Sequence, residues 1–493
     1  MSENAKQLTM GARLRQSAKA LGDAVVFRSV KGIDNYREIS WRDLDQKSDT
    51  IAQSLLAMEV AENPATVLLL TRDAVDHSVL AYGAWKAGQT ILCLPPGIGA
   101  AEGRAILSRI GRTIAVGAEV PWYEGEALAK PADVISSLPA DMADPVSDPL
   151  MLVATGGSTG VPKLVDVLGA GLFTPGAFLG GLNSALKRLP RARSFIMTPL
   201  SHGAGAATSY MATFEEGQVT TLERFDPEVA LWAIEKFQLE QITTVPTMMH
   251  RMLASEGFKT RNLDSIRSLV HTGGHIDPDD KEAWIARIGA EKVLEVWGSS
   301  ESVGHAVIAG DEWLRHRGSV GKPVNCHVSI VDEEGKEVPQ GAIGEIFVQP
   351  LIPRVNLERK YYKSDLRMKS LNGYVSFGDL GYLDEGGYLY IAGRVDDLII
   401  TGGANVYPDE VEILIRRLPG VEDCVVVGKP HRDLGIAVHA VISLKPGATE
   451  MSIDELRAVL TGELSAYKLP RSVEYRSELP RTDAGKIRRK NYR

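Results

Sequence analysis

Two stretches far apart in the sequence could surround an anion with positive charge and hydrogen-bond donors. The first is TGGSTGVPK at residues 155–163, with three glycines, three hydroxyls and a lysine, and it follows the apolar run LMLVA at 150–154. Glycines let backbone N–H groups converge on an anion, while hydroxyls and an ammonium add donors and charge. The second is LPRTDAGKIRRK at residues 479–490, which places Lys486 directly after a glycine. The first stretch is a candidate for phosphate binding, while the second, taken alone, is more typical of a solvated basic tail.

The glycine loop does not fit the Walker phosphate-binding pattern. That pattern, GxxxxGK[ST], needs a glycine directly before the lysine and a hydroxyl directly after it. In this chain Pro162 precedes Lys163 and Leu164 follows it. A P-loop kinase or NTPase is therefore excluded. Two interpretations stay open for the loop itself: phosphate binding in another class of protein, or an ordinary surface loop.

Composition narrows the class of protein. The chain has 493 residues, 44% hydrophobic and 24% charged, which is typical of a globular enzyme with about three domains. A net charge of −8 argues against nucleic acid as a partner, because duplex binding usually needs a basic face. The three cysteines are widely spaced and predict neither a disulfide framework nor a zinc site. Without a secretory signal or a long apolar run, we expect no membrane span and a cytoplasmic location.

Helix and strand patterns alternate through most of the chain. Helical periodicity at 39–58 and 77–88 is interleaved with apolar runs at 65–71 and 90–96. Such alternation predicts an α/β fold with mostly parallel sheets. From about residue 318 the apolar runs are separated by turn residues, which indicates a β-rich region. The last hundred residues indicate a small α+β module, with a helix predicted at 453–464.

Five stretches follow one another along the chain: TGGSTGVPK (155–163), VWGSSE (296–301), FGDLGYLDEGGYLYIAGRVDD (377–397), TGGANVYPDEVE (401–412) and LPRTDAGKIRRK (479–490). Taken in this order, they resemble the motifs of the adenylate-forming superfamily, which includes acyl-CoA synthetases, adenylation domains and firefly luciferase. The resemblance covers essentially the whole chain and is closest to acyl- or aryl-CoA ligases and the related amide bond synthetases. It implies that ATP activates a carboxylic acid, whose carboxylate attacks the α-phosphate to give an acyl-adenylate and pyrophosphate.

The resemblance also implies the domain organisation. We expect a large N-terminal domain at 1–395, made of two mixed α/β sheet subdomains and a β-subdomain at about 318–395. A small, mobile α+β C-terminal domain at 396–493 should carry the catalytic lysine. Asp396 lies at the position of the family's hinge. Rotation there would alternate the small domain between an adenylating pose and a second-step pose.

The resemblance assigns catalytic and nucleotide-binding roles. Lys486 would bridge the carboxylate and the α-phosphate, and Glu301 would hold Mg²⁺. Trp297 would stack on adenine in place of the usual Tyr or Phe, and Asp379 would accept the ribose hydroxyls. Apart from the motifs, Lys486 could belong to a basic tail, Trp297 to the core, and Asp379 and Arg394 to surface salt bridges. The residues expected to bind ATP are Thr155, Gly156, Gly157, Ser158, Thr159, Gly160, Lys163, Gly273, Gly274, His275, Trp297, Gly298, Ser299, Ser300, Asp379 and Arg394.

The stretch PLSHGAGAATSY at 199–210 corresponds to the family's acyl pocket, and His202 to its catalytic gate histidine. No carboxylate occurs between Phe195 and Tyr210, which argues against an amino-acid substrate. Small residues leave volume, so we expect a bulky, ring-containing or aryl acid. The residues expected to bind it are His202, Gly203, Ala204, Ala207, Gly274, Gly298, Ser302 and Gly304.

Two acceptors for the acyl group remain open. Gly402 and Gly403 resemble the glycines that border the pantetheine tunnel of CoA ligases, so CoA is the first expectation. An amide bond synthetase, in which an amine attacks the adenylate, is the alternative. A non-catalytic binding protein of this fold is disfavoured because Lys486 and Glu301 are both present. We expect small-molecule partners and either a monomer or a homodimer.

Overall fold

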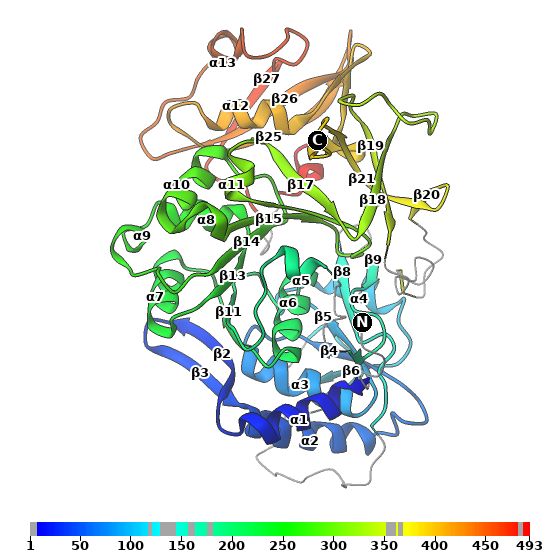
Figure 1. Ribbon diagram of the computed structural model, residues 1–493. Helices are drawn as coiled ribbons and strands as arrows, with labels where there is room; N and C mark the ends of the chain where they lie inside the picture. The colour runs from blue at the N-terminus through cyan, green and yellow to red at the C-terminus, as the bar shows by residue number, and fades with distance from the viewer. Residues whose placement is uncertain are drawn as a thin grey trace.

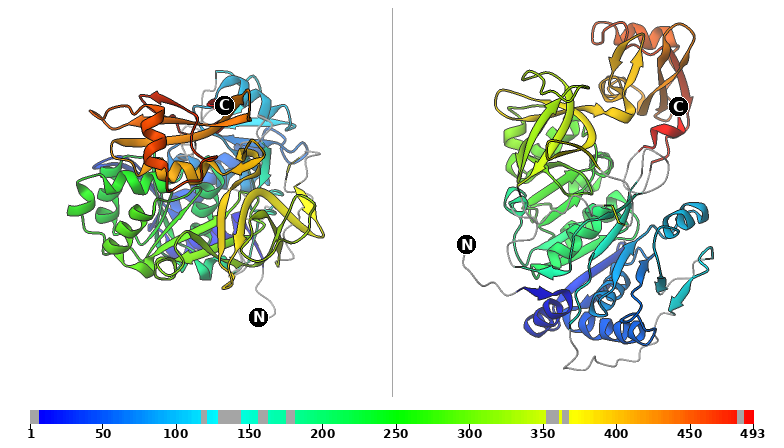
Figure 2. Two further views of the ribbon diagram at one scale, coloured as in Figure 1. Left: turned by 90° about the horizontal axis from the view of Figure 1, so that it is seen from above. Right: turned by 90° about the vertical axis from the view of Figure 1, so that its right-hand side faces the viewer.

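The computed structural model describes residues 7–116, 121–128, 144–155, 163–174, 181–351, 361–362, 368–481 and 487–493. Within these residues, two large sheets with helices against them form the lower body, and a small C-terminal unit lies above it (Figures 1 and 2). This α/β architecture, with a large N-terminal part and a small C-terminal one, confirms the predicted fold class. No helix in the described residues is both long and apolar enough to cross a membrane.

The first sheet has the strand order β7-β6-β4-β5-β8-β9. All its pairs are parallel except β8–β9, which is an antiparallel hairpin. Its central strands are short, fully buried apolar runs, as expected for a parallel sheet covered on both faces. The strands are β4 (Thr66–Leu69), β5 (Thr90–Cys93), β6 (Thr113–Val116), β7 (Glu126–Leu128), β8 (Met151–Thr155) and β9 (Lys163–Asp166).

The second sheet has fourteen described strands, in the order β18-β19-β21-β22-β17-β16-β15-β14-β13-β11-β12-β2-β3, with β20 beside β21. The strands from β2 to β15 run parallel, and the pairs from β15 to β18 are antiparallel. The strands are β2 (Val25–Gly32), β3 (Asn35–Ser40), β11 (Arg193–Ile196), β12 (Gln218–Leu222), β13 (Gln241–Thr244), β14 (Ser268–Thr272), β15 (Val293–Gly298), β16 (His305–Ala309), β17 (Ser319–Val324), β18 (Cys326–Val331), β19 (Gly344–Pro350), β20 (Lys369–Leu371), β21 (Tyr374–Leu383) and β22 (Leu389–Arg394).

Helices cover both sheets, and their starts follow from the sequence. Ser40 caps the second helix by accepting from the Asp43 backbone N–H at 3.0 Å, and Asp226 followed by Pro227 starts the seventh. A short pair, β1 (Leu8–Thr9) and β10 (Leu172–Phe173), ties the N-terminal segment down. The helices are α1 (Met10–Leu21), α2 (Trp41–Leu56), α3 (Ala74–Lys86), α4 (Ala100–Leu107), α5 (Leu182–Ala185), α6 (Gly203–Phe214), α7 (Pro227–Phe237), α8 (Pro246–Leu253), α9 (Gly257–Thr260), α10 (Pro278–Ile288) and α11 (Gly310–Trp313).

The C-terminal unit packs helices on a three-stranded sheet with the order β25-β26-β27. The helix predicted at 453–464 ends earlier, at Leu460, because Thr461 is extended and Gly462 has a φ of +100°. The elements are β23 (Ile399–Thr401), β24 (Ala404–Val406), α12 (Pro408–Arg416), β25 (Val421–His431), β26 (Gly435–Leu444), α13 (Ile453–Leu460) and β27 (Ser472–Arg476), with short 3₁₀ turns η3 (Val395–Asp397) and η4 (Arg489–Asn491).

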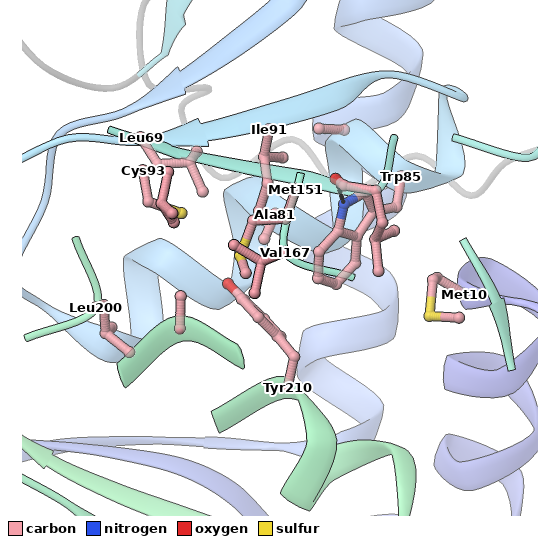
Figure 3. Packing of buried hydrophobic residues seen from close by; sticks show 14 of the residues in the cluster. Met10, Leu69, Ala81, Trp85, Ile91, Cys93, Met151, Val167, Leu200 and Tyr210 are labelled. Carbon is pink, nitrogen blue, oxygen red and sulfur yellow. Dashed lines mark hydrogen bonds between the residues drawn. The ribbon is translucent and has the colours of Figure 1, made fainter. Parts of the chain in front are cut away.

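An aromatic contact joins the two sheets through α3 and α6. The rings of Trp85 and Tyr210 meet edge to face with centroids 4.6 Å apart, and Trp85 Nε1–H donates to the Leu150 carbonyl at 3.0 Å (Figure 3). Buried His77 Nδ1 lies 2.7 Å from the Tyr210 hydroxyl. These contacts fix the position of α6, whose first turn carries His202 and Gly203.

The buried imidazole of His77 should make the fold sensitive to acid. Burial lowers the pKa of His77 to about 3, below the ordinary value of 6.5. Between these pH values the unfolded chain binds one proton more, so the free energy of unfolding falls as pH falls. From pH 7 to 5 this group should account for a loss of about 2 kcal/mol, which His77→Leu should remove.

Urea denaturation of the wild type and His77→Leu at pH 7, 6 and 5 would measure this difference. His250→Leu is the control. The hydrogen bond with Asp280 raises the pKa of His250. Replacing this histidine should therefore not reduce the fall in the free energy of unfolding between pH 7 and 5. If the free energy of unfolding falls equally between pH 7 and 5 in the wild type and in His77→Leu, His77 is not the group responsible for the acid sensitivity.

Candidate active site

The predicted motif residues collect at one edge of the second sheet. Strands β14 and β15 are parallel neighbours, so their carboxyl ends emerge together. Strand β14 leads into Gly273, Gly274 and His275, all exposed, and β15 ends at Trp297 and Gly298. The Thr272 hydroxyl donates to the Val296 carbonyl at 2.8 Å and ties the two strand ends together. Ligand sites of α/β sheets commonly lie at such edges.

A hydrogen-bonded group of three side chains forms the centre of the site. Trp297 Nε1–H donates to Asp379 Oδ2 at 2.9 Å, and Arg394 Nε lies 3.3 Å from Asp379 Oδ1. Asp379 and Arg394 are register partners on β21 and β22. Arg394 Nη2 also donates to the Phe377 carbonyl at 2.6 Å. The group combines an indole face with a carboxylate acceptor, which suits a planar heterocycle bearing hydroxyls.

Tyr361 is a site residue that the sequence analysis missed. Its hydroxyl donates to Glu301 Oε1 at 3.0 Å, and Lys163 Nζ lies 4.8 Å from its ring centroid. Burial, with the Glu301 charge, raises the pKa of Tyr361, so the hydroxyl stays protonated and donates. The KYYK context carries no motif, and only the backbone bridge between Tyr361 and Val165 brings the ring to the site.

The Glu301 carboxylate fits a magnesium ion that arrives with phosphates. In the described residues, Glu301 forms no bond other than the one to Tyr361, which leaves Oε2 for a ligand. The described part of the chain also holds no cluster of three or more His, Cys, Asp or Glu side chains suited to a metal. Mg²⁺ is usually bound by one or two carboxylates together with substrate phosphates.

The glycine loop joins the hairpin β8–β9. Thr155 and Lys163 are register partners at the end of this hairpin. The predicted phosphate-binding residues Gly156, Gly157, Ser158, Thr159 and Gly160 lie outside the described residues, as does Lys486.

The first turn of α6 lies beside the end of the VWGSSE motif. A Cβ atom on Gly203 would lie 3.5 Å from Ser300 Oγ and 3.6 Å from Val153 Cγ2. His202 precedes the helix without capping it through its side chain. Ala204 is exposed and Ala207 half-buried. The structure therefore brings Gly203, directly after His202, close to Ser300 and to Val153 of strand β8.

Several predicted pocket residues have a packing or turn role. A Cβ on Gly304 would lie 2.9 Å from Cys326 Sγ, and one on Gly298 would lie 2.6 Å from His305 Cδ2. Gly304 is buried, so close packing against β18 accounts for its small size. Ser302 adopts a left-handed φ of 51°, and its N–H donates to the Ser299 carbonyl at 3.0 Å, which turns the chain after the motif.

The predicted acceptor and hinge residues lie on the C-terminal side. Gly402 and Gly403 form the two-residue turn of β23–β24, with φ values of +55° and +84° that favour glycine. Gly402 N–H donates to the Leu434 carbonyl at 3.1 Å. Asp396 lies in η3, and its carbonyl accepts from Arg493 Nη2 at 2.7 Å.

A buried ion pair links helix α10 to strands β14 and β15. Lys281 on α10 is fully buried and pairs with Glu295 on β15, while His271 Nε2 on β14 lies 3.8 Å from the same carboxylate. His271 and Glu295 are register partners. The ammonium of Lys281 also lies 4.6 Å from the Trp313 ring centroid. The cluster links α10, β14 and β15 directly behind the motifs.

Removal of one partner of this pair should be costly. Lys281→Met leaves the buried Glu295 carboxylate without its counter-charge, so the free energy of unfolding should fall by about 3–5 kcal/mol. The double variant Lys281→Met with Glu295→Leu should regain most of this stability, because it buries no charge. Chemical denaturation of the single and double variants would measure both values. A double variant no more stable than Lys281→Met would contradict this account.

Comparison with known proteins gives consistent matches along the chain. The profile of the AMP-binding enzymes matches residues 14–352, and that of the AMP-binding enzyme C-terminal domain matches residues 410–486. The indoleacetate–CoA ligase of Aromatoleum aromaticum is 31% identical over 381 residues, which cover 76% of this chain and 72% of that protein.

Solved structures share the fold over nearly the whole length. The o-succinylbenzoate CoA synthetase of Bacillus subtilis, solved with its acyl-adenylate intermediate, superposes with a TM-score of 0.78 at 24% identity and covers 99% of this chain and 98% of its own. The amide bond synthetase McbA of Marinactinospora thermotolerans superposes with a TM-score of 0.75 at 22% identity, covering 98% of this chain and 99% of its own.

Proposed function

This chain belongs to the AMP-binding enzyme family, and we propose that it is an AMP-forming acyl-CoA ligase. In the proposed reaction, ATP and a carboxylic acid give an acyl-adenylate and pyrophosphate. The thiol of CoA then attacks the acyl carbon, and AMP leaves. The observation that carries the proposal is the bonded group of Trp297, Asp379 and Arg394 beside Glu301. It provides the acceptor, aromatic face and metal ligand that a nucleotide needs.

The residues of the site divide the first step between them. Trp297 would stack on adenine, Asp379 would accept the ribose hydroxyls, and Glu301 would hold Mg²⁺. When bound, Mg²⁺ neutralises phosphate charge. Lys163 and the glycine loop would bind the β- and γ-phosphates. Lys486 would bridge the attacking carboxylate and the α-phosphate, so that two anions can approach each other.

The position of the C-terminal unit supports an adenylating arrangement. Arg488, two residues after Lys486, lies 3.7 Å from Glu102 at the start of α4 in the N-terminal part. Arg488 therefore lies close to the N-terminal part of the chain. We propose Asp396 as the hinge for a second pose, with the N-terminal domain at 1–395 and the C-terminal domain at 396–493. Arg493 bonds to the Asp396 carbonyl and to Asp397.

We propose a ring-containing or aryl acid as the substrate. The first turn of α6, next to Ser300, consists of glycine and alanine, which carry no large side chain toward a substrate. The carboxylate that would pair with an amino-acid substrate is missing between Phe195 and Tyr210. An indoleacetate–CoA ligase among the relatives acts on an acid of this kind.

CoA is preferred as the acceptor because a CoA ligase is a sequence relative above 30% identity. An amine is the second candidate, since the amide bond synthetase shares the fold over nearly its entire length. The same N-terminal residues would serve either reaction. The choice therefore concerns only the second step.

Adenylation should depend on the acid, on ATP and on Lys486. With a panel of aryl, ring-containing and short linear acids, we expect pyrophosphate release to be greatest with the bulky acids. Lys486→Ala should lower release by a factor on the order of 10² or more, as expected for loss of transition-state charge stabilisation. Lys490→Ala is the matched control, since it removes a neighbouring charge of the same type. Reaction of short linear acids alone would refute the proposed substrate class, and unchanged release by Lys486→Ala would refute its role.

The acceptor can be identified once a reactive acid is known. Incubation with ATP, that acid and either CoA or a panel of amines should give a thioester that depends on the enzyme, detected by mass spectrometry. Amide formation at a much higher rate than thioester formation would instead establish the amide bond synthetase. The adenylate forms in both cases, so its accumulation serves as the internal control.

A further inference from the structure

We propose that Tyr361 is a positioning residue for nucleotide binding, which keeps the Glu301 carboxylate and the Lys163 ammonium apart and ready for a magnesium–triphosphate ligand. The inference rests on the proposed function, because that function supplies the ligand. It adds a residue to which neither the motifs nor the family comparisons give a role.

The Tyr361 side chain contacts two opposite charges. Its hydroxyl donates to Glu301 Oε1 at 3.0 Å, and Lys163 Nζ lies over its ring, 4.8 Å from the centroid. In the described part of the chain, neither Lys163 nor Glu301 forms an ion pair. The tyrosine thus engages both charged groups, which do not pair with each other.

The backbone fixes this arrangement. Tyr361 forms an antiparallel bridge with Val165, and Tyr362 N–H donates to the Leu164 carbonyl at 2.9 Å. Both partners lie on β9, directly after Lys163. The tyrosine side chain is only 8% exposed, so packing restricts its rotation. Lys163 and Tyr361 therefore lie on adjacent, hydrogen-bonded segments.

This geometry leaves each charge available to a ligand. The hydroxyl occupies Oε1 of Glu301 and orients the carboxylate, while Oε2 stays open to a cation. The ammonium over the ring is held by a cation–π contact, which is weak enough to exchange for a phosphate oxygen. A direct ion pair between Lys163 and Glu301 would have to break before either could bind a ligand.

Replacement of Tyr361 by Phe tests the hydroxyl separately from the ring. Tyr361→Phe keeps the packing and the cation–π contact but frees the Glu301 carboxylate. Loss of one hydrogen bond to a charged group corresponds to about a ten-fold weaker binding. We therefore expect the Mg²⁺ concentration needed for half-maximal ATP binding to rise about ten-fold. Tyr361→Leu removes the ring as well and should weaken ATP binding further at every Mg²⁺ concentration.

Titration calorimetry of ATP into the full-length protein, at a series of Mg²⁺ concentrations and without acid, measures this effect without turnover. Tyr475→Phe is the matched control, because it removes a hydroxyl bonded to the Met451 carbonyl in the C-terminal unit. At saturating Mg²⁺, kcat of Tyr361→Phe for pyrophosphate release should return to near the wild-type value, while its KM for Mg²⁺ stays raised.

The outcomes separate the two proposals. If the wild type binds ATP and Tyr361→Phe shows the same Mg²⁺ dependence, the inference about Tyr361 is wrong and the proposed function is unaffected. A loss of ATP binding in Tyr361→Phe that extra Mg²⁺ does not relieve would also overturn it, since it would indicate a general structural defect. Failure of the wild type to bind ATP at any Mg²⁺ concentration would refute the proposed function, and with it the ligand that Tyr361 serves.

Discussion

The hydrogen bond from the Trp297 indole to Asp379 connects the parallel half of the second sheet to its antiparallel half. Trp297 lies at the end of β15, the last parallel strand, and Asp379 lies on β21, four strands further on in the antiparallel part. Without this bond the indole could rotate, and the carboxylate would lose a neutral donor that orients it. The bond thus sets the relative positions of an aromatic face, an acceptor and, four residues further along, Glu301. Every role proposed for the nucleotide depends on that arrangement.

Two sets of buried contacts stabilise the elements that carry the site. One is an ion pair and the other is an aromatic contact. Behind the strand ends, Lys281 and Glu295 neutralise each other where water cannot reach them. Beneath α6, the edge-to-face contact of Trp85 and Tyr210 buries large apolar rings between the sheets (Figure 3). A buried ion pair adds little net stability over apolar residues of the same size, but removal of one partner is costly. Burial of the aromatic rings stabilises the fold through the apolar area removed from water.

The sequence predicted local structure and motif order well, and tertiary pairing poorly. The helical pattern at 39–58 is helix α2, and the apolar run at 65–71 contains strand β4. Local periodicity suffices for these elements. It could not show that β2 and β3 pair beside β12 in the second sheet, or that β17 continues that sheet from β16. Such partners are set by contacts between distant residues. Tyr361 was missed for the same reason, since its place depends on the bridge to Val165.

The nucleotide and the acceptor are proposed to contact different parts of the chain. This separation is relevant to how one fold can use different acceptors. The residues proposed to bind the nucleotide, apart from Lys486, lie in the N-terminal part, where β14, β15, β21 and β22 hold them. The glycines proposed to border the acceptor path, Gly402 and Gly403, present only backbone, and the positive φ of both turn positions favours glycine there. A turn without side chains restricts the width of a passage but does not distinguish a thiol from an amine. Under the proposed function, discrimination between acceptors would come from groups along the passage and from the nucleophile itself. A CoA synthetase and an amide bond synthetase both share the fold of this chain.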